Sequence, residues 1–272
     1  MRTRFFAILL AIFTCAHAHA ATPFVVTPAP PIWIEDMTSP EIRAALNDGK
    51  TTIIIPTGGT EQNGQHLSLG KHNFILKYTA MEIARRLGNA LAAPIMQYVP
   101  EGDIHPPAGH MKFAGTISLK PETFAAVLED TARSFKEHGF KTICFVGEHG
   151  GSQPVQQAVA AKLSAEWQGE GVRVIHVGAY YDSQANGQVA WAQKMDVKEP
   201  DIEAHAGLAD TAEMLSVNPK GVRQNLRAAH TAADMDKLGA GGSSLGATRE
   251  MGAMFLELKV RAAVKQIQEA TR

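Results

Sequence analysis

Three short segments of this 272-residue chain combine histidines with acidic residues. They contain Glu61, His66 and His72 in the first segment, Glu148 and His149 in the second, and His205 and Asp210 in the third. Glutamate oxygens and histidine nitrogens together suit zinc, manganese or iron. The residue types therefore predict a metal site, with imidazoles and carboxylates that could also move protons.

Glycines surround two of these segments. Gly58 and Gly59 precede the first, and Gly150 and Gly151 directly follow His149. Because glycine lets the backbone turn tightly, such loops can bring several side chains to one point. A single histidine in a loop is more often a surface or hydrogen-bonding residue. Three clusters that each follow a strand or precede a helix favour a functional site.

The rest of the chain alternates between short apolar runs and amphipathic stretches. We expect strands at residues 51–56, 91–99, 141–146 and 172–177, and helices at residues 74–87, 121–138, 154–167 and 251–270. A further helix is predicted to begin at Ser39, its cap, with Pro40 in the first helical position. A helix that starts near Gly207 would let His205 and Asp210 face one pocket.

Strands and helices that alternate in this way predict an α/β fold, a three-layer α/β/α sandwich with a mainly parallel sheet. Ligands bind at the carboxyl ends of strands in such sheets. The loops at residues 57–73 and 147–153 follow predicted strands, so we expect them to form the site. Cys144 lies within an apolar strand, which predicts a buried structural thiol and no nucleophile.

Residues 1–20 have the features of a secretory signal peptide. Arg2 and Arg4 precede an apolar run at residues 5–15, and small residues at 18–20 form a cleavage site. The apolar run is too short for a membrane anchor, and the residues before Cys15 fit a lipoprotein anchor poorly. We expect a periplasmic or secreted protein, with a Pro-rich arm at residues 21–35 and one catalytic domain at residues 36–272. The arm would lie on a neighbouring subunit or stay loose.

The composition excludes some partners. The formal net charge is only −1, and no basic stripe suited to nucleic acid is present. After the leader, no stretch of 18 apolar residues follows, so no membrane partner is expected once the leader is cleaved.

Five segments in the order of the chain resemble the creatininase (creatinine amidohydrolase) family. The first is residues 56–72, which begins with Pro-x-Gly at the end of a predicted strand. The others are residues 110–119 with Gly-Thr-Ile, residues 147–152 with His-Gly-Gly, residues 205–212 with His-Ala-Gly, and residues 246–252. The likeness runs from about residue 33 to the C-terminus. It implies an α/β/α fold, homo-oligomers, and a metal site that hydrolyses C–N bonds in small cyclic or formylated amides.

This chain departs from the family pattern at its metal ligands. The resemblance places metal-binding residues at Glu61 and His149, but Asn63 stands where the family has a histidine, and His72 where it has a bridging aspartate. Imidazoles rarely bridge two ions, so we expect one ion per subunit, held by Glu61, His72 and His149. Three ligands and an open position suit catalytic zinc or iron. Zinc is the first expectation, with manganese or iron as alternatives.

The remaining candidates are assigned roles around that ion. We expect His205 to transfer a proton or contact substrate, Glu148 to act as a base or replacement ligand, and Asp210 to bind metal or orient His205. His110 is expected to line the pocket. His66 is expected to contact substrate or to support the loop through a hydrogen bond.

The sequence thus predicts an exported metal-dependent amidohydrolase that acts on small amides, lactams or formamides with metal-activated water. Two alternatives remain open: a binding protein without activity on the same scaffold, and a metal-dependent esterase or lactonase. Creatinine is not the expected substrate. Family members that act on it carry an aromatic residue and an acid where this chain has Gly150 and Gly151.

Overall fold

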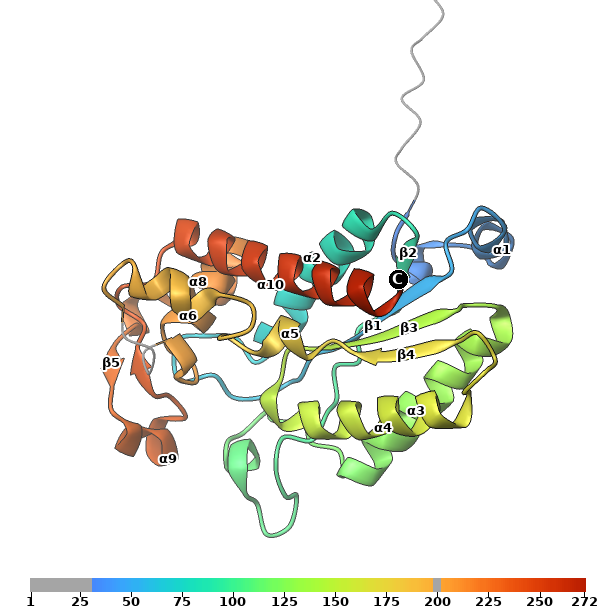
Figure 1. The fold of residues 1–272 in the computed structure, drawn as a ribbon. Coiled ribbons are helices and arrows are strands. Elements are labelled where there is room, and N and C mark those ends of the chain that lie inside the picture. Colours follow the sequence, from blue (N-terminus) through green and yellow to red (C-terminus); the bar gives the residue numbers. More distant parts are fainter. Residues whose placement is uncertain (1–30, 198–201) are drawn as a thin grey trace, which may run out of the picture. The chain divides into compact units, whose positions relative to one another are not determined.

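A parallel four-stranded sheet forms the centre of the computed structural model, which describes residues 31–197 and 202–272 (Figure 1). The strands are β1 (Thr52–Thr57), β2 (Ala90–Ala92), β3 (Thr142–Gly147) and β4 (Arg173–His176), in the order β2-β1-β3-β4. The parallel sheet and its alternation with helices confirm the expected fold class. The predicted signal peptide and most of the arm lie outside the described residues.

The strand predicted at residues 91–99 is much shorter than expected. β2 ends at Ala92, and beyond it only isolated bridges join Met96 to Thr57 and Val99 to Ser118. Pro94 lies two residues after the end of β2 and has no backbone N–H to give to a strand partner, which accounts for the early end. The prediction of a nine-residue strand was therefore wrong.

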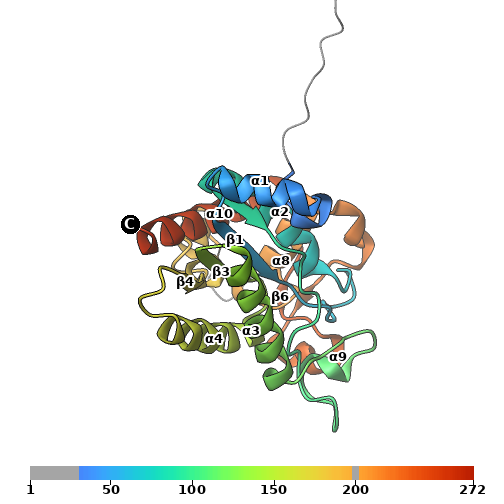
Figure 2. The ribbon, with the colours of Figure 1, turned by 90° about the vertical axis from the view of Figure 1, so that its right-hand side faces the viewer.

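Alternate residues of β1 point into two different cores. Ile53 and Ile55 pack with α3 (Pro121–His138) and α4 (Gln153–Glu166) on one face of the sheet. Ile54 packs on the other face with α2 (Lys71–Leu87) and α10 (Arg249–Ala270). Figure 2 shows the sheet between these two helical layers. Both faces of the sheet are covered, which is why its strands are apolar throughout rather than alternating.

The helix boundaries follow the expected capping rules with small shifts. α1 (Ser39–Asn47) is capped by Thr38, one residue before the predicted cap, and the backbone N–H of Thr38 donates to Glu41 (2.6 Å). α2 begins at Lys71, three residues earlier than predicted. α3 has the predicted bounds and ends at Gly139, whose φ of 107° is left-handed.

The smaller elements that follow β4 are α5 (Gly178–Tyr181), α6 (Gln188–Gln193), α8 (Leu208–Val217), α9 (Met235–Leu238), β5 (Ala229–His230) and β6 (Gly242–Ser243). A third apolar cluster includes residues of α6 and α8 together with Phe255 of α10. The helix predicted near Gly207 is α8, with Gly207 as its N-cap. α8 packs closely on α10 at Gly252, where a Cβ atom would lie only 1.8 Å from the Ala212 carbonyl oxygen.

The strand order places a crevice at the carboxyl ends of β1 and β3. β2 flanks β1 on one side and β3 flanks it on the other, and Thr57 pairs with Gly147 at the end of the ladder. The helices that follow the two strands cover opposite faces of the sheet (Figure 1). Ligands bind at such switch points in α/β sheets. The two loops predicted to form the site therefore begin side by side.

The described end of the arm packs on its own chain. Trp33 is buried and forms a parallel bridge with Ala92, and the Lys77 ammonium lies 4.3 Å from the centre of the Trp33 ring. Cys144 is fully buried in β3, where burial raises the pKa of its thiol, in agreement with the expected structural role. None of the helices in the described part of the chain is long and apolar enough to cross a membrane.

Candidate metal centre

A cavity of about 890 Å³ opens at the carboxyl ends of the strands. Its wall includes the loops that follow β1 and β3 and the beginning of α8. Histidines and carboxylates of all three sequence segments lie in its wall. The lining includes Glu61, His72, His110, Glu148, His149, His205 and Asp210.

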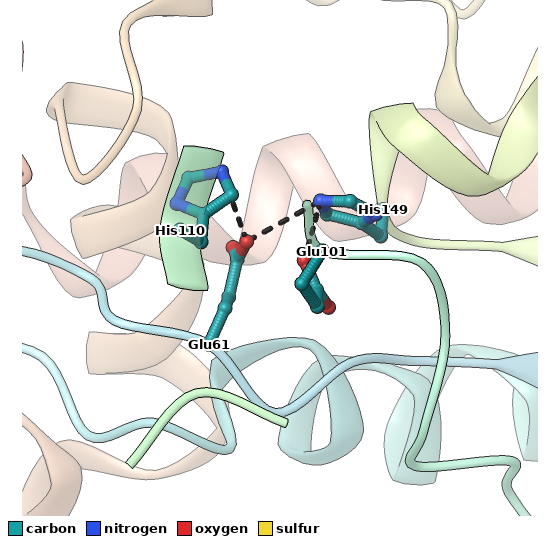
Figure 3. A group of neighbouring side chains, drawn as sticks. All are labelled: Glu61, Glu101, His110 and His149. Carbon is teal, nitrogen blue, oxygen red and sulfur yellow. Dashed lines mark ion pairs between the residues drawn. The ribbon is translucent and has the colours of Figure 1, made fainter. Parts of the chain in front are cut away.

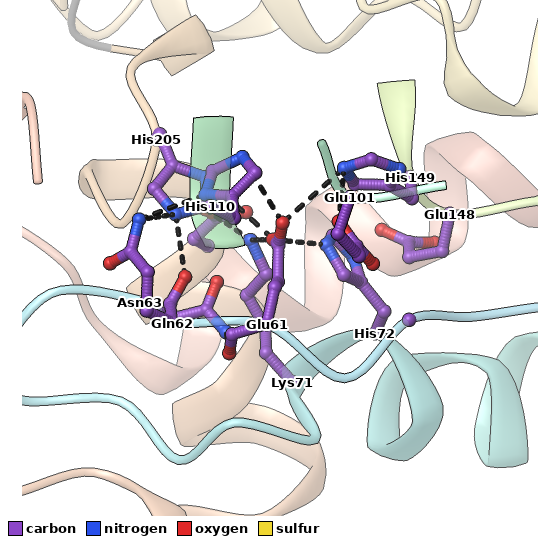
Figure 4. A network of polar contacts seen from close by, with 12 residues as sticks. Glu61, Gln62, Asn63, Lys71, His72, Glu101, His110, Glu148, His149 and His205 are labelled. Atoms are coloured by element: carbon purple, nitrogen blue, oxygen red, sulfur yellow. Dashed lines mark hydrogen bonds and ion pairs between the residues drawn. The ribbon is translucent and has the colours of Figure 1, made fainter. Parts of the chain in front are cut away.

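Glu61 lies at the centre of this group and is fully buried. Its Oε1 atom lies 2.7 Å from the Nε2 atom of His72. Its Oε2 atom lies 3.2 Å from Nε2 of His110 and 3.3 Å from Nε2 of His149 (Figure 4). The three residues predicted to bind metal, Glu61, His72 and His149, thus meet at one carboxylate.

Glu101 joins the group and was not predicted from the sequence. Its Oε2 atom lies 2.8 Å from Nε2 of His149, and its backbone N–H donates to Ser118 (2.9 Å). Gly59 leaves room for this carboxylate, since a Cβ atom there would lie 2.4 Å from Oε1 of Glu101. Glu61, Glu101, His110 and His149 each offer one ligand atom, and these atoms lie within 4.8 Å of one another (Figure 3).

Several buried oxygens of this cluster lack hydrogen bonds. Within the described residues, Oε1 of Glu101 has no hydrogen-bond partner, whereas Oε2 of Glu61 and Oε2 of Glu101 contact imidazole nitrogens at 2.8–3.3 Å without the geometry of a hydrogen bond. A buried polar group without a partner costs free energy, and a buried charge costs more unless it is paired or bound to a metal. Two carboxylates and two imidazoles are also a donor set suited to a divalent transition ion. The residues present therefore fit a divalent metal ion.

The electrostatics of the cluster depend on burial. Burial lowers the pKa of His72 to about 3 and that of His110 to about 4, so both imidazoles are neutral and have a free lone pair at neutral pH. Burial also opposes the charge on His149, but the carboxylates of Glu101 and Glu61 outweigh it and raise its pKa. Burial raises the pKa of Glu101. The pair of Glu101 and His149 therefore holds a proton that a bound cation would displace.

His72 lies outside the group of four. It contacts Oε1 of Glu61, whereas His110 and His149 contact Oε2. Its place as a metal ligand remains a prediction. His110, expected to line the pocket, does so and also lies among the potential ligands, while its contact with substrate stays a prediction.

Glu148 was expected to serve as a base or replacement ligand, but its carboxylate already pairs with a lysine and accepts a hydrogen bond from a tyrosine. Its Oε1 atom lies 2.5 Å from the ammonium of Lys259, and the Tyr180 hydroxyl donates to Oε2. Lys259 also lies 2.8 Å from Glu213, so a buried cation separates the two carboxylates. Glu148 lines the cavity but belongs to this second charged cluster.

Asp210 and His205 lie near the centre with separate partners. Asp210 accepts hydrogen bonds from the Lys71 ammonium (2.6 Å) and from the backbone N–H of Ala206 (2.8 Å). His205 places Nε2 2.9 Å from the carbonyl oxygen of Gln62 and Nδ1 3.8 Å from Oε1 of Glu61. No hydrogen bond joins Asp210 to His205 among the described residues, so the expected orienting role is not supported by a contact.

His66 does not line the cavity. It is fully buried, and its Nε2 atom lies 2.9 Å from the hydroxyl of Thr211. This contact matches the loop-supporting alternative, whereas the expected contact with substrate has no counterpart in the structure. The side chain of Asn63 also stabilises the loop, because its Nδ2 donates a hydrogen bond to the backbone oxygen of Glu61 (3.0 Å).

The chain is similar to several known proteins. The model of the creatininase family, described as creatinine amidohydrolase, matches residues 35–267. A mycofactocin precursor peptide peptidase of Mycolicibacterium smegmatis is 27% identical over 175 residues, which cover 62% of this chain and 59% of that protein. Creatinine amidohydrolase of Pseudomonas putida is 25% identical over 118 residues, covering 43% of this chain and 45% of that enzyme. This chain thus spans less than two thirds of the length of these relatives.

Solved creatininase structures match over more of the chain. One described as a Zn-Zn type and one described as creatininase Mn are 22% and 23% identical, each with a TM-score of 0.74. Each match covers 89% of this chain and 99% of the other. This likeness supports the fold derived above.

Proposed function

Because the chain belongs to the creatininase family, we propose that it is a metal-dependent hydrolase that cleaves C–N bonds of small amides, lactams or formamides. The observation that carries the proposal is the buried cluster of Glu61, Glu101, His110 and His149, which borders a cavity and leaves carboxylate oxygens without hydrogen bonds. Relatives described as a peptidase and as an amidohydrolase both act on C–N bonds, which supports this reaction class.

The four residues of the cluster would hold the ion. Such an ion would supply Lewis acidity, which lowers the pKa of water and polarises a carbonyl oxygen. Zinc is the first candidate and manganese the second, because similar creatininase structures are described with each. Two carboxylates and two imidazoles accommodate either metal.

His205 is the chain's own candidate for proton transfer. Burial lowers the pKa of its imidazole, so the ring is neutral at neutral pH. Nε2 lies 2.9 Å from the carbonyl oxygen of Gln62, which can only accept, and 3.4 Å from the side-chain amide nitrogen of Gln62, so the shorter contact assigns the hydrogen to Nε2. Nδ1 is then the free acceptor, and it lies on the side of Glu61, 3.8 Å from Oε1. His205 would take a proton at Nδ1 and return it to a leaving nitrogen.

We also propose that the protein works outside the cytoplasm as a homo-oligomer. The basic, apolar and small-residue order of residues 1–20 supports export. Size-exclusion chromatography with light scattering would give the oligomeric state, and N-terminal sequencing of the exported protein would locate the cleavage site.

Metal analysis and a substrate panel test the function together. The purified protein should contain zinc or manganese after reconstitution and hydrolyse members of a panel of small amides, lactams and formamides. Glu61→Gln and His149→Ala should lose both metal and activity, whereas His138→Ala, at the exposed end of α3, should lose neither.

Other outcomes of the same experiment would overturn the proposal. A protein that binds no metal after reconstitution would be a binding protein on this scaffold. A metal-loaded protein that hydrolyses esters or lactones but no amide would be an esterase or lactonase.

A further inference from the structure

Lys71 places a buried cation in the wall of the cavity. It is the first residue of α2, its side chain is only 2% exposed, and it lines the cavity. Its ammonium lies 2.6 Å from Oδ2 of Asp210 and 3.8 Å from Oε1 of Glu61. Buried lysines are rare unless they are paired with an acid. The carboxylates of Asp210 and Glu61 supply that pairing and stabilise the charged form of Lys71.

The two oxygens of Glu61 face different surroundings. Oε2 faces His110 and His149, the side on which the potential ligand atoms gather. Oε1 faces His72, Lys71 and His205 (Figure 4). Glu61 therefore lies between a candidate metal position and a fixed ammonium.

On the Lys71 side, the ammonium already pairs with the nearby carboxylates, and among the described residues the imidazoles of His72 and His205 remain beside Oε1 of Glu61. Asp210 is engaged by the ammonium, which holds the pKa of its carboxyl low against the effect of burial. The amide of Asn63 donates to the loop backbone, and Gly151 offers no side chain beside His149. A second divalent ion here would also have to lie close to the ammonium, and like charges at such distances repel strongly in a buried site.

The charges of the centre balance with one ion. Glu61, Glu101 and Asp210 carry three negative charges when ionised, which a single divalent ion and one ammonium neutralise. We propose that the Lys71 ammonium takes the place of a second metal ion, so that the cavity holds one divalent ion per chain. The inference rests on the proposed metal-dependent function and assigns Lys71 the role of a built-in cation.

Metal stoichiometry tests this inference without an activity assay. The full-length mature protein is stripped with chelator, titrated with zinc, and measured by native mass spectrometry and elemental analysis. The wild type should bind one zinc ion per chain at saturation. Lys71→Met removes the ammonium from Asp210 and from Oε1 of Glu61 and should bind a second zinc ion, whereas Lys71→Arg keeps the charge and should bind one.

Each result bears on a specific claim. A wild type that binds two ions, or a folded Lys71→Met variant that binds only one, would overturn the role of Lys71 and leave the hydrolase proposal standing. A wild type that binds none would overturn the proposed function and this inference with it. If Lys71→Met does not fold, as circular dichroism would show, the count for the wild type alone still decides between one ion and two.

Discussion

The Nε2 atom of His149 lies 2.8 Å from Oε2 of Glu101, although the two residues are far apart in the sequence. The contact joins the loop after β3 to the segment after β2 across the central strand β1. It also gives the centre its second carboxylate, which the sequence motifs did not indicate. Two of the predictions below depend directly on this pair.

Replacement of Glu101 by Gln should weaken zinc binding. The variant keeps the size of the side chain but removes the charge that faces His149. Loss of supporting residues around a metal costs about 10–100-fold in affinity, so loss of a ligand should cost at least that much. Competition with a fluorescent zinc chelator would measure the change. Glu203→Gln, which alters an exposed carboxylate in the lining of the same cavity, should leave the affinity unchanged.

Zinc affinity should rise with pH. Burial opposes the charge on His149, but Glu101 and Glu61 raise its pKa to about 9, so zinc must displace a proton at neutral pH. Affinity should increase up to about tenfold per pH unit for each proton released, and level off near pH 9. Calorimetry in two buffers of different ionisation enthalpy would count these protons. An identical heat in both buffers at pH 7 would contradict the prediction.

Gly59→Ala should lower zinc affinity without unfolding the protein. A methyl group there would lie 2.4 Å from Oε1 of Glu101 and 3.3 Å from the Cδ2 atom of His72, so the Glu101 carboxylate would have to move. We expect a loss of about tenfold or more in zinc affinity, by analogy with other changes around metal ligands. Gly49→Ala is the matched control, because Gly49 also has a positive φ (88°, against 158° at Gly59) but its Cβ would meet nothing within 4 Å. Equal affinities in the two variants would show that Glu101 does not need this space.

His66 should make the fold sensitive to acid. Burial lowers the pKa of its imidazole from 6.5 to about 4. The unfolded chain therefore takes up a proton before the folded one does, and stability present above pH 6.5 is lost as pH falls toward 4. The shift corresponds to at most about 3 kcal/mol. Urea unfolding between pH 7 and pH 4 should show a smaller loss in His66→Gln than in wild type. His138→Gln, at an exposed position, should follow the wild type.

Lys259→Met should destabilise the protein strongly. The change would leave Glu148 and Glu213 buried without the ammonium that lies 2.5 Å and 2.8 Å from them. Removal of one partner from a buried ion pair typically costs about 3–5 kcal/mol. Lys162→Met removes an exposed lysine 2.7 Å from Glu129 and should cost at most about 1 kcal/mol. Comparable unfolding midpoints for the two variants would argue against a stabilising role for the Lys259 cluster.

The parallel sheet and the position of Glu61 and His149 could be predicted because both depend on local pattern. Short apolar runs mark the strands, and the carboxyl ends of parallel strands meet at one edge. The same rule could have found Glu101, since it follows the strand predicted at residues 91–99 by two residues. Asp103 and His105 follow it closely, but the segment matches none of the creatininase motifs, so the family resemblance does not point to it.

The roles of the remaining charged residues depend on contacts that sequence spacing does not contain. Glu148 and His149 are neighbours, but successive side chains of an extended segment point in opposite directions. His149 meets Glu101, whereas Glu148 meets Lys259 on α10, 111 residues later. Lys71 and Asp210 form their ion pair across 139 residues. Only the packing of α8 and α10 on α2 brings such partners together.

The tight contact between α8 and α10 also limits how the sequence can vary. The backbone of Gly252 lies so close to Ala212 that any larger residue would force α8 outward. Asp210 and Glu213 are both on α8, so the displacement would reach the cavity. In a library of random variants selected for zinc retention, we expect this distant glycine to tolerate replacement as poorly as the ligands themselves.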